Sequence, residues 1–204
     1  MFEGEPVLVT AARQTAGRGR SGAKWVDADR ALAASLAFRP GWPKASWGRI
    51  PLVAGLAAVD VLGGVGLKWP NDVVRDGEKI AGILSEAADG VVVVGMGANL
   101  WWKRPIEGAG SLWDRDHGIE DARILGESWA IRLLARMHGG AEDWGREEYQ
   151  RRCTLIGEEI TWDPDGRGLA VGVDGFGRLI VEVDEELVVL ESGAVRVVRK
   201  GPGR

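Results

Sequence analysis

The sequence predicts an α/β (α+β) domain followed by a small module made of strands alone. Three observations support this fold class: apolar runs of strand length, apolar residues at helical spacing, and a change near Leu155 to short β-rich runs. A chain of 204 residues is long enough for one ordinary domain and a small second one. We therefore expect a first domain at 1–153 and a second at 154–204.

The elements of the first domain follow from these patterns in order. Apolar runs at 6–11 and 31–38 suit two strands. Residues 48–64 have helical spacing, with a proline near the start and two glycines at the end. Between 66 and 100, two Asp-Gly turn dipeptides separate three apolar runs, which predict three successive strands in an antiparallel meander. Two further helices are predicted, at 120–137 and 142–153.

The second domain has a different sequence pattern, in which short runs alternate with turn sequences. The sequences DPDG, DGFGR and ESGA punctuate short β-rich runs. Short strands and turns at regular spacing are typical of a small β-barrel or a sandwich-like module. We place the boundary between the two patterns at 153–156.

Composition and charge limit the classes of function. With 45% hydrophobic residues, 27% charged residues and a net charge of −4, the chain lacks the overall positive charge typical of nucleic-acid binders. Any attraction for anions must therefore be local. Cys153 is the only cysteine, so no internal disulfide can form, and a reducing, cytoplasmic compartment is expected. The start does not resemble a signal peptide, and the longest apolar stretch, 91–102, is too short to span a membrane.

Residues 14–25 (QTAGRGRSGAKW) form a glycine-rich, basic stretch after the first predicted strand. Its G-x-G-x-x-G spacing suggests a dinucleotide fingerprint, but that motif opens a helix and needs an acid about twenty residues later. Trp42 stands at that distance, after a poor helix start, so this interpretation fails. An RNA-binding segment would repeat the motif, and a merely solvated loop is the other alternative. We favour an anion-binding loop, in which backbone N–H groups approach the ligand and Arg18 and Arg20 supply bidentate charge.

Three later motifs place polar residues at strand ends or near strand glycines. KWPND puts Asn71 and Asp72 after a proline, where an ordinary turn is the alternative. KIAGIL puts Lys79 at the head of a strand that contains Gly82, and a strand glycine often marks the close approach of a ligand. GMGANL contains Asn99, whose amide can read an adenine edge. Taken singly, each motif fits a structural role better than a functional one.

Together and in this order, the motifs resemble those of the biotin protein ligases. That family carries G-R-G-R-x-G-x-x-W, K-W-P-N-D, K-x-x-G-I-L-x-E and G-x-G-x-N in its central domain. This chain has GRGRSGAKW at 17–25, KWPND at 68–72, KIAGILSE at 79–86 and GMGAN at 95–99. The resemblance is strong over this half of the chain and weaker beyond it.

The resemblance implies both a fold and an activity. The fold would be a central domain with a mixed sheet, followed by an SH3-like barrel. The activity would be that of a monofunctional ligase, which makes biotinyl-AMP from biotin and MgATP and transfers biotin to one lysine of a carboxylase carrier domain. The alternatives are a lipoate-type ligase and a non-catalytic or impaired binder of biotin or biotinyl-adenylate. A homodimer is left open.

The resemblance also implies which residues form the site. Arg18, Arg20 and Lys79 would be catalytic, because with Mg²⁺ they neutralise the biotin carboxylate and the ATP α-phosphate as these anions meet. The loop would close over the ligands and exclude water. The residues implied on the biotin side are Gln14, Gly17, Arg18, Gly19, Arg20, Lys79 and Gly82. Those implied on the ATP side are Arg20, Trp25, Asn71, Asp72 and Asn99, with Mg²⁺ held by the ATP phosphates and Asp72 as its one candidate protein ligand.

Three departures from the family pattern qualify these expectations. Ser21 and Ala23 stand where the family has basic residues, so the positive field of the loop is weaker. The family has an earlier Ser/Thr-Thr-Asn segment that contacts the biotin rings, and this chain begins after that position. We expect a truncated start, another source for that part, or impaired activity. No helix-turn-helix domain precedes the core, so DNA binding is not expected.

Overall fold

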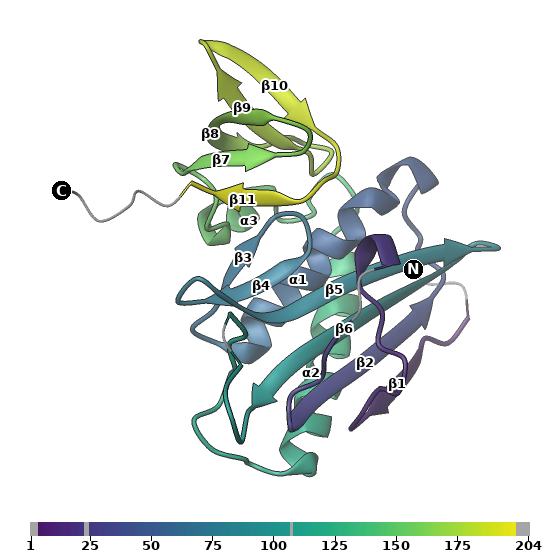
Figure 1. Ribbon diagram of the computed structural model, residues 1–204. Helices are drawn as coiled ribbons and strands as arrows, with labels where there is room; N and C mark the ends of the chain where they lie inside the picture. The colour runs from purple at the N-terminus through teal and green to yellow at the C-terminus, as the bar shows by residue number, and fades with distance from the viewer. Residues whose placement is uncertain (1–3, 23–24, 107, 199–204) are drawn as a thin grey trace.

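The computed structural model describes residues 4–22, 25–106 and 108–198, which fold into two β-sheets and three α-helices (Figure 1). The predicted α/β fold class is confirmed. The departure noted at Ala23 lies outside the described residues. One segment of the described chain, Lys44–Leu62, is long and apolar enough to cross a membrane, but 67% of its most apolar window is buried inside the fold. It is a core helix.

The larger sheet contains the six strands of the first domain. They are β1 (Val7–Ala11), β2 (Arg30–Phe38), β3 (Gly66–Lys68), β4 (Asp72–Arg75), β5 (Glu78–Ala88) and β6 (Val91–Trp101). Their order is β1-β2-β6-β5-β4-β3, and every pair is antiparallel. The predicted meander is confirmed, with its first run divided into β3 and β4 by the turn at 69–71. The sheet is antiparallel, so the expectation of a mixed sheet was wrong.

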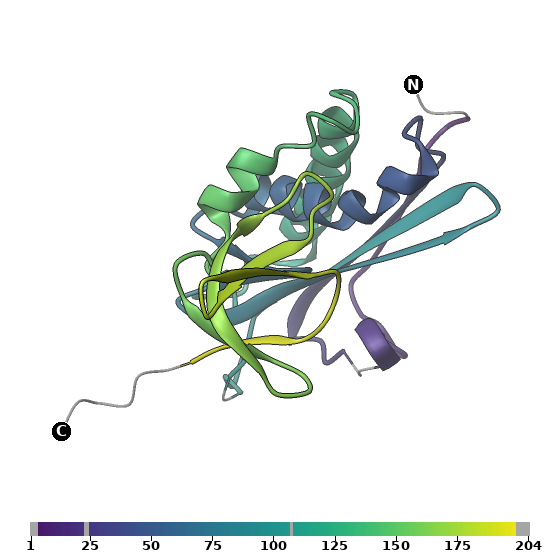
Figure 2. The ribbon, with the colours of Figure 1, turned by 90° about the horizontal axis from the view of Figure 1, so that it is seen from above.

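The helices cover one face of this sheet and leave the other face open (Figure 2). They are α1 (Ile50–Leu62), preceded by the 3₁₀ helix η2 (Lys44–Arg49), then α2 (Ile119–Met137) and α3 (Arg146–Arg152). The first two predicted helices are confirmed. The third begins later than predicted because Gly145, with φ +93°, lies in the left-handed region immediately before it. A further 3₁₀ turn, η1 (Arg20–Gly22), lies over the open face.

The C-terminal module, predicted as a small β-barrel or sandwich-like module, is a five-stranded antiparallel sheet, which is consistent with the implied SH3-like barrel. Its strands are β7 (Glu159–Trp162), β8 (Gly166–Val173), β9 (Leu179–Val183), β10 (Glu186–Leu190) and β11 (Val195–Val197), in the order β10-β9-β8-β7-β11. The module is not separate from the first domain: Ile160 and Val181 belong to the same buried cluster as Leu67 and Trp69. The two sheets therefore share one hydrophobic core.

Small residues follow one another across the open face of the larger sheet. Ala33 in β2 pairs with Gly97 in β6, and Gly97 pairs with Gly82 in β5. Next to this row, Ser35 pairs with Gly95. Side chains of this size leave space above the sheet, so the register of three strands creates a shallow floor on which a ligand can lie.

Candidate active site

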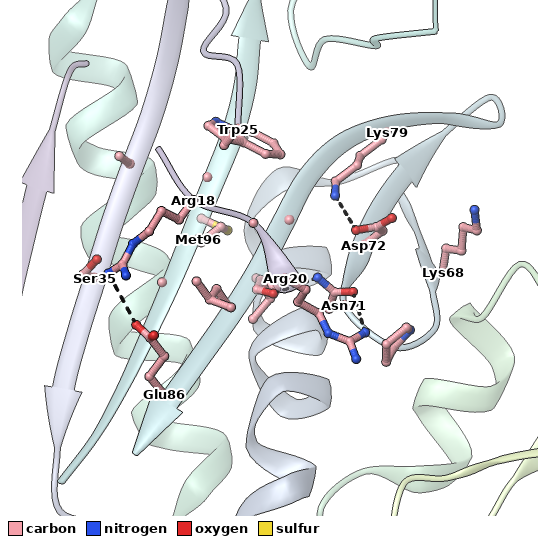
Figure 3. Close-up of a pocket in the computed structure, with 18 of the residues that line it drawn as sticks. Arg18, Arg20, Trp25, Ser35, Lys68, Asn71, Asp72, Lys79, Glu86 and Met96 are labelled. Carbon is pink, nitrogen blue, oxygen red and sulfur yellow. Dashed lines mark hydrogen bonds and ion pairs between the residues drawn. The ribbon is translucent and has the colours of Figure 1, made fainter. Parts of the chain in front are cut away.

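A cavity of about 630 Å³ lies above this floor. It is lined by the loop that follows β1, by the turn at 69–71, and by β5 and β6, several of whose side chains are labelled in Figure 3. Residues 192–195 of the C-terminal module also line it. A volume of this size is typical of small-molecule sites. The cavity therefore unites segments that are more than half the chain apart.

Nine of the eleven predicted site residues line the cavity: Gln14, Arg18, Gly19, Arg20, Trp25, Asn71, Asp72, Lys79 and Gly82. Gly17 and Asn99 are not among its lining residues. Gly17 accepts the backbone N–H of Trp25 at 3.1 Å. Asn99 is 5% exposed, and its Oδ1 accepts the backbone N–H of Ala28 at 3.3 Å. Both residues support the walls of the site in this structure, and direct contact with a ligand stays a prediction for them.

Lys79 lies between a carboxylate and an aromatic ring. Its Nζ is 2.6 Å from Oδ1 of Asp72 and 5.4 Å from the centre of the Trp25 ring (Figure 3). The pair arises because β4 and β5 are neighbours, with a bulge at Val73/Val74 that brings the two side chains together. Side-chain exposures of 40% for Lys79 and 24% for Asp72 leave the ammonium accessible to a ligand anion.

The two arginines reach opposite ends of the cavity (Figure 3). Arg18 lies 3.9 Å from Glu86, and both side chains are mostly exposed, so this ion pair is weak and easily exchanged for another anion. Arg20 donates to Oδ1 of Asn71 at 3.3 Å. Asn71 is itself fixed, because its backbone oxygen accepts from Ile83 N–H at 2.8 Å and its Nδ2 donates to the Ile83 carbonyl at 2.9 Å.

The Trp25 indole rests on glycines. A Cβ at Gly97 would lie 3.0 Å from Trp25 Cε2, and one at Gly82 would lie 3.3 Å from Cζ3. Trp25 Nε1 donates to Oδ1 of Asp27 at 2.9 Å, which fixes the orientation of the ring. Only residues without side chains leave room for an indole this close to the sheet, so these glycines have a packing reason beyond flexibility.

The charge of the cavity differs in sign from that of the chain. Among the described lining residues, four are cationic and two are carboxylates: Arg18, Arg20, Lys68 and Lys79 against Asp72 and Glu86. A local excess of positive charge in a chain of net charge −4 can attract and hold anionic ligands. No group of three His, Cys, Asp or Glu side chains with metal-binding geometry occurs in the described part of the chain.

Sequence reasoning missed several lining residues. Lys68 and Trp69 belong to the KWPND motif that we had singled out, so the motif itself was the available signal. Ser35 lies on a strand with no motif. The segment Ser192–Val195 carried only a turn sequence, and nothing local to it indicated that it would reach the cavity.

Comparison with known proteins gives a consistent family. Residues 4–99 match the model of the biotin/lipoate A/B protein ligase family. A biotin–acetyl-CoA-carboxylase ligase of Mycobacterium tuberculosis is 35% identical over 93% of this chain and 78% of its own length. The ligase of the same name from Paracoccus denitrificans is 30% identical over 85% of this chain and 82% of its own.

A solved structure of a biotin protein ligase has the same fold as this chain. The biotin protein ligase of Aquifex aeolicus, solved in complex with biotin and ATP, superposes with a TM-score of 0.80. The two sequences are 24% identical, and the superposition covers 94% of this chain and 89% of the Aquifex aeolicus chain. The motifs, the cavity that unites them and the two close relatives together show that the chain belongs to the biotin protein ligase family.

Proposed function

We propose that this ligase activates biotin with ATP to biotinyl-AMP and transfers biotin to a lysine of the carrier domain of an acyl-CoA carboxylase. The cationic cavity of about 630 Å³ supports the proposal most strongly, because it combines basic groups for two anions with an apolar floor and a flat indole. The names of the two close relatives support the same activity. Biotin and ATP are therefore the proposed small-molecule substrates.

In the first half-reaction, an oxygen of the biotin carboxylate attacks the α-phosphorus of ATP, the bond to the bridging oxygen of the β-phosphate breaks, and pyrophosphate leaves. Both reactants are anions that repel each other in water. Arg18, Arg20 and Lys79 line one cavity, so they can hold the two anions together and stabilise charge that develops at phosphorus. No covalent intermediate with the enzyme is needed.

In the second half-reaction, the neutral amine of the carrier lysine attacks the acyl carbon, the bond from the acyl carbon to the phosphate oxygen breaks, and AMP leaves. Water competes with the amine for the same carbon. The loop that carries Arg18 and Arg20 lies over the cavity and would shield the mixed anhydride from hydrolysis.

Magnesium fits this site only together with ATP. Mg²⁺ is commonly bound through substrate phosphates and one or two carboxylates, and it keeps several waters. Asp72 is the carboxylate on the proposed nucleotide side, and no larger group of protein ligands surrounds it among the described residues. Asp72 would hold the ion on the ATP phosphates, and the ion would supply additional neutralisation of phosphate charge.

Two further features of the chain belong to the same proposal. We propose a division into 1–153 and 154–204, supported by the end of α3 at Arg152 and the start of β7 at Glu159. We also propose a cytoplasmic location. It is supported by Cys153, the one cysteine of the sequence, which cannot form an internal disulfide; burial raises the pKa of its thiol and keeps it protonated and unreactive. The homodimer is still left open, and the absence of DNA binding stays a prediction.

Biotin-dependent exchange of labelled pyrophosphate into ATP is the expected activity of the purified chain. Exchange with biotin but not with lipoate would support the proposal. Exchange with lipoate alone would show a lipoate-type ligase. Calorimetric binding of biotin with no exchange would show a binder that does not catalyse.

Replacing Arg18 with alanine is expected to speed the release of biotinyl-AMP by about tenfold, since a hydrogen bond to a charged group contributes roughly 1.5–3 kcal/mol. The adenylate released from a single turnover can be measured by rapid filtration. Arg13→Ala is the matched control, because Arg13 is an exposed arginine close to the same loop and does not line the cavity. Equal release rates in both variants would show that Arg18 is only a solvated residue.

A further inference from the structure

The turn between β8 and β9 is the part of the C-terminal module that inserts against the first domain. Asp174 organises this turn: its Oδ1 accepts the backbone N–H groups of Phe176 at 2.8 Å and Arg178 at 2.9 Å, and its Oδ2 accepts from Arg178 Nε at 2.7 Å. Gly177, with φ +84°, completes the turn in a conformation that favours glycine. These contacts give the turn, residues 174–178, a defined shape.

Two buried tryptophans of the first domain bind the tip of this turn. Trp69 Nε1 donates to the carbonyl of Gly177 at 2.9 Å, and Trp144 Nε1 donates to the carbonyl of Gly175 at 3.1 Å. Both indoles are 2% exposed. The bond from Trp69 is buried, so water cannot replace its acceptor if the Gly177 carbonyl moves, whereas the bond from Trp144 to the exposed Gly175 is part-buried. A buried donor left without a partner is costly, so the turn can move little without a loss of stability.

The fit at Gly177 allows no side chain. A Cβ at this position would lie 2.3 Å from Cδ1 of Leu52, a residue of α1 that is itself 3% exposed. Gly175, two residues earlier in the same turn, has nothing within 4 Å of its would-be Cβ. The turn therefore contains one glycine that the contact requires and one that it does not.

Trp69, the residue that bonds to Gly177, connects this contact with the cavity. Trp69 lines the cavity and is followed, after one proline, by Asn71, whose Oδ1 holds Arg20. Asn71 is also the point at which the turn at 69–71 joins β5, through its two hydrogen bonds with Ile83. A shift of the Trp69 indole would therefore move the wall that presents Asn71 and Arg20.

We propose that the carbonyl of Gly177 is a positioning group: it holds the Trp69 indole, and through it the turn at 69–71, in the geometry that binds ATP. The C-terminal module would thus set the affinity for the nucleotide through a contact that does not touch the nucleotide. This inference rests on the proposed function, in which Asn71 and Arg20 lie on the ATP side.

The test compares Gly177→Ala with Gly175→Ala in pyrophosphate exchange, with KM measured separately for ATP and for biotin. We expect Gly177→Ala to raise KM for ATP by about tenfold, the effect of one lost buried hydrogen bond with added strain, and to change KM for biotin by less than about twofold. Gly175→Ala should behave as wild type. An unchanged KM for ATP in Gly177→Ala would overturn the proposal, as would an equal rise in both KM values, which indicates general damage to the fold.

Trp69→Phe is the second variant, because it keeps an aromatic ring and removes the N–H donor, together with part of the buried volume of the indole. It should show the same selective rise in KM for ATP, and the double variant with Gly177→Ala should be no worse than the more affected single variant. Additive effects would show two independent roles and would overturn the proposal. If Gly177→Ala does not fold, Trp69→Phe decides alone. Wild-type protein without exchange would contradict the proposed function itself, whereas active wild type with unaffected variants would contradict only this inference.

Discussion

Replacing Lys79 with methionine is expected to lower biotin-dependent pyrophosphate exchange by about a hundredfold or more, which is the typical effect of removing one preorganised group that stabilises transition-state charge. Methionine keeps the approximate length of the side chain and removes the charge that lies over the Trp25 ring. It removes the ammonium of Lys79, which lies between Trp25 and Asp72. The loss should appear in the first half-reaction, which pyrophosphate exchange measures without the carrier protein.

The control for this prediction is Lys103→Met. Lys103 is exposed and does not line the cavity, so exchange should stay within about twofold of wild type, as for most surface substitutions. Transfer from chemically made biotinyl-AMP to the carrier lysine gives a second readout. If Lys79→Met retained full exchange, Lys79 would have no part in adenylation and the roles assigned to the cavity would be wrong.

Replacing Gly82 with valine is expected to weaken the binding of both substrates by about tenfold to a hundredfold. A Cβ at this position lies 3.2 Å from Nζ of Lys79 and 3.3 Å from the Trp25 ring. The branches of valine would therefore enter the space that both groups occupy, and overpacking of this kind costs roughly 1–3 kcal/mol. Isothermal titration with biotin, and then with an ATP analogue, measures the two affinities.

Gly95→Ala tests whether this effect depends on position. Gly95 lies on the same open face, but its would-be Cβ is 3.7 Å from its nearest neighbours, the Leu84 carbonyl and the Ser35 hydroxyl. A methyl group at that distance makes ordinary contact, so we expect much weaker effects on both affinities. Similar losses in Gly95→Ala and Gly82→Val would show that the floor is generally intolerant and that Gly82 has no special relation to Lys79 and Trp25.

The fold could be predicted from the sequence where local patterns determine it. The three-strand meander was found because two Asp-Gly dipeptides form its turns, with Asp76 and Asp89 at positive φ. The start of the third helix was misplaced because the apolar and charged pattern continues through Trp144, and only the left-handed conformation of Gly145 ends the preceding loop. The Asp-Gly turns indicate antiparallel pairing only for the strands that they join, and no motif indicates how β1, β2 and β3 pair, so the implied mixed sheet was wrong.

The candidate site was predictable where a motif carries both the chemistry and the local shape. Lys79 and Asp72 come from different motifs, and the register of β4 and β5 brings them to 2.6 Å. Asn99 stands in a motif as well, but its side chain is buried and its Oδ1 accepts the backbone N–H of Ala28. No local pattern could identify Ser192–Val195, because their place on the cavity depends on how the C-terminal module docks.

The docking of the C-terminal module likewise depends on tertiary contacts that no local pattern indicates. The contacts of Gly177 with Trp69 and Leu52 join residues more than one hundred positions apart. In the sequence, the DGFGR stretch reads only as a turn, and a turn of this composition is normally solvated. Tertiary packing gives it a partner, and this is why the proposed link between the module and ATP affinity needed the structure.

A crystal structure of the chain with biotin and a non-hydrolysable ATP analogue is the most direct test of the central claim, that one cationic cavity brings two anionic reactants together. The account predicts both ligands in the cavity, with Lys79 and at least one of Arg18 and Arg20 within about 3 Å of the carboxylate or the α-phosphate. A complex in which the ligands occupy the cavity while all three side chains point away from them would contradict it.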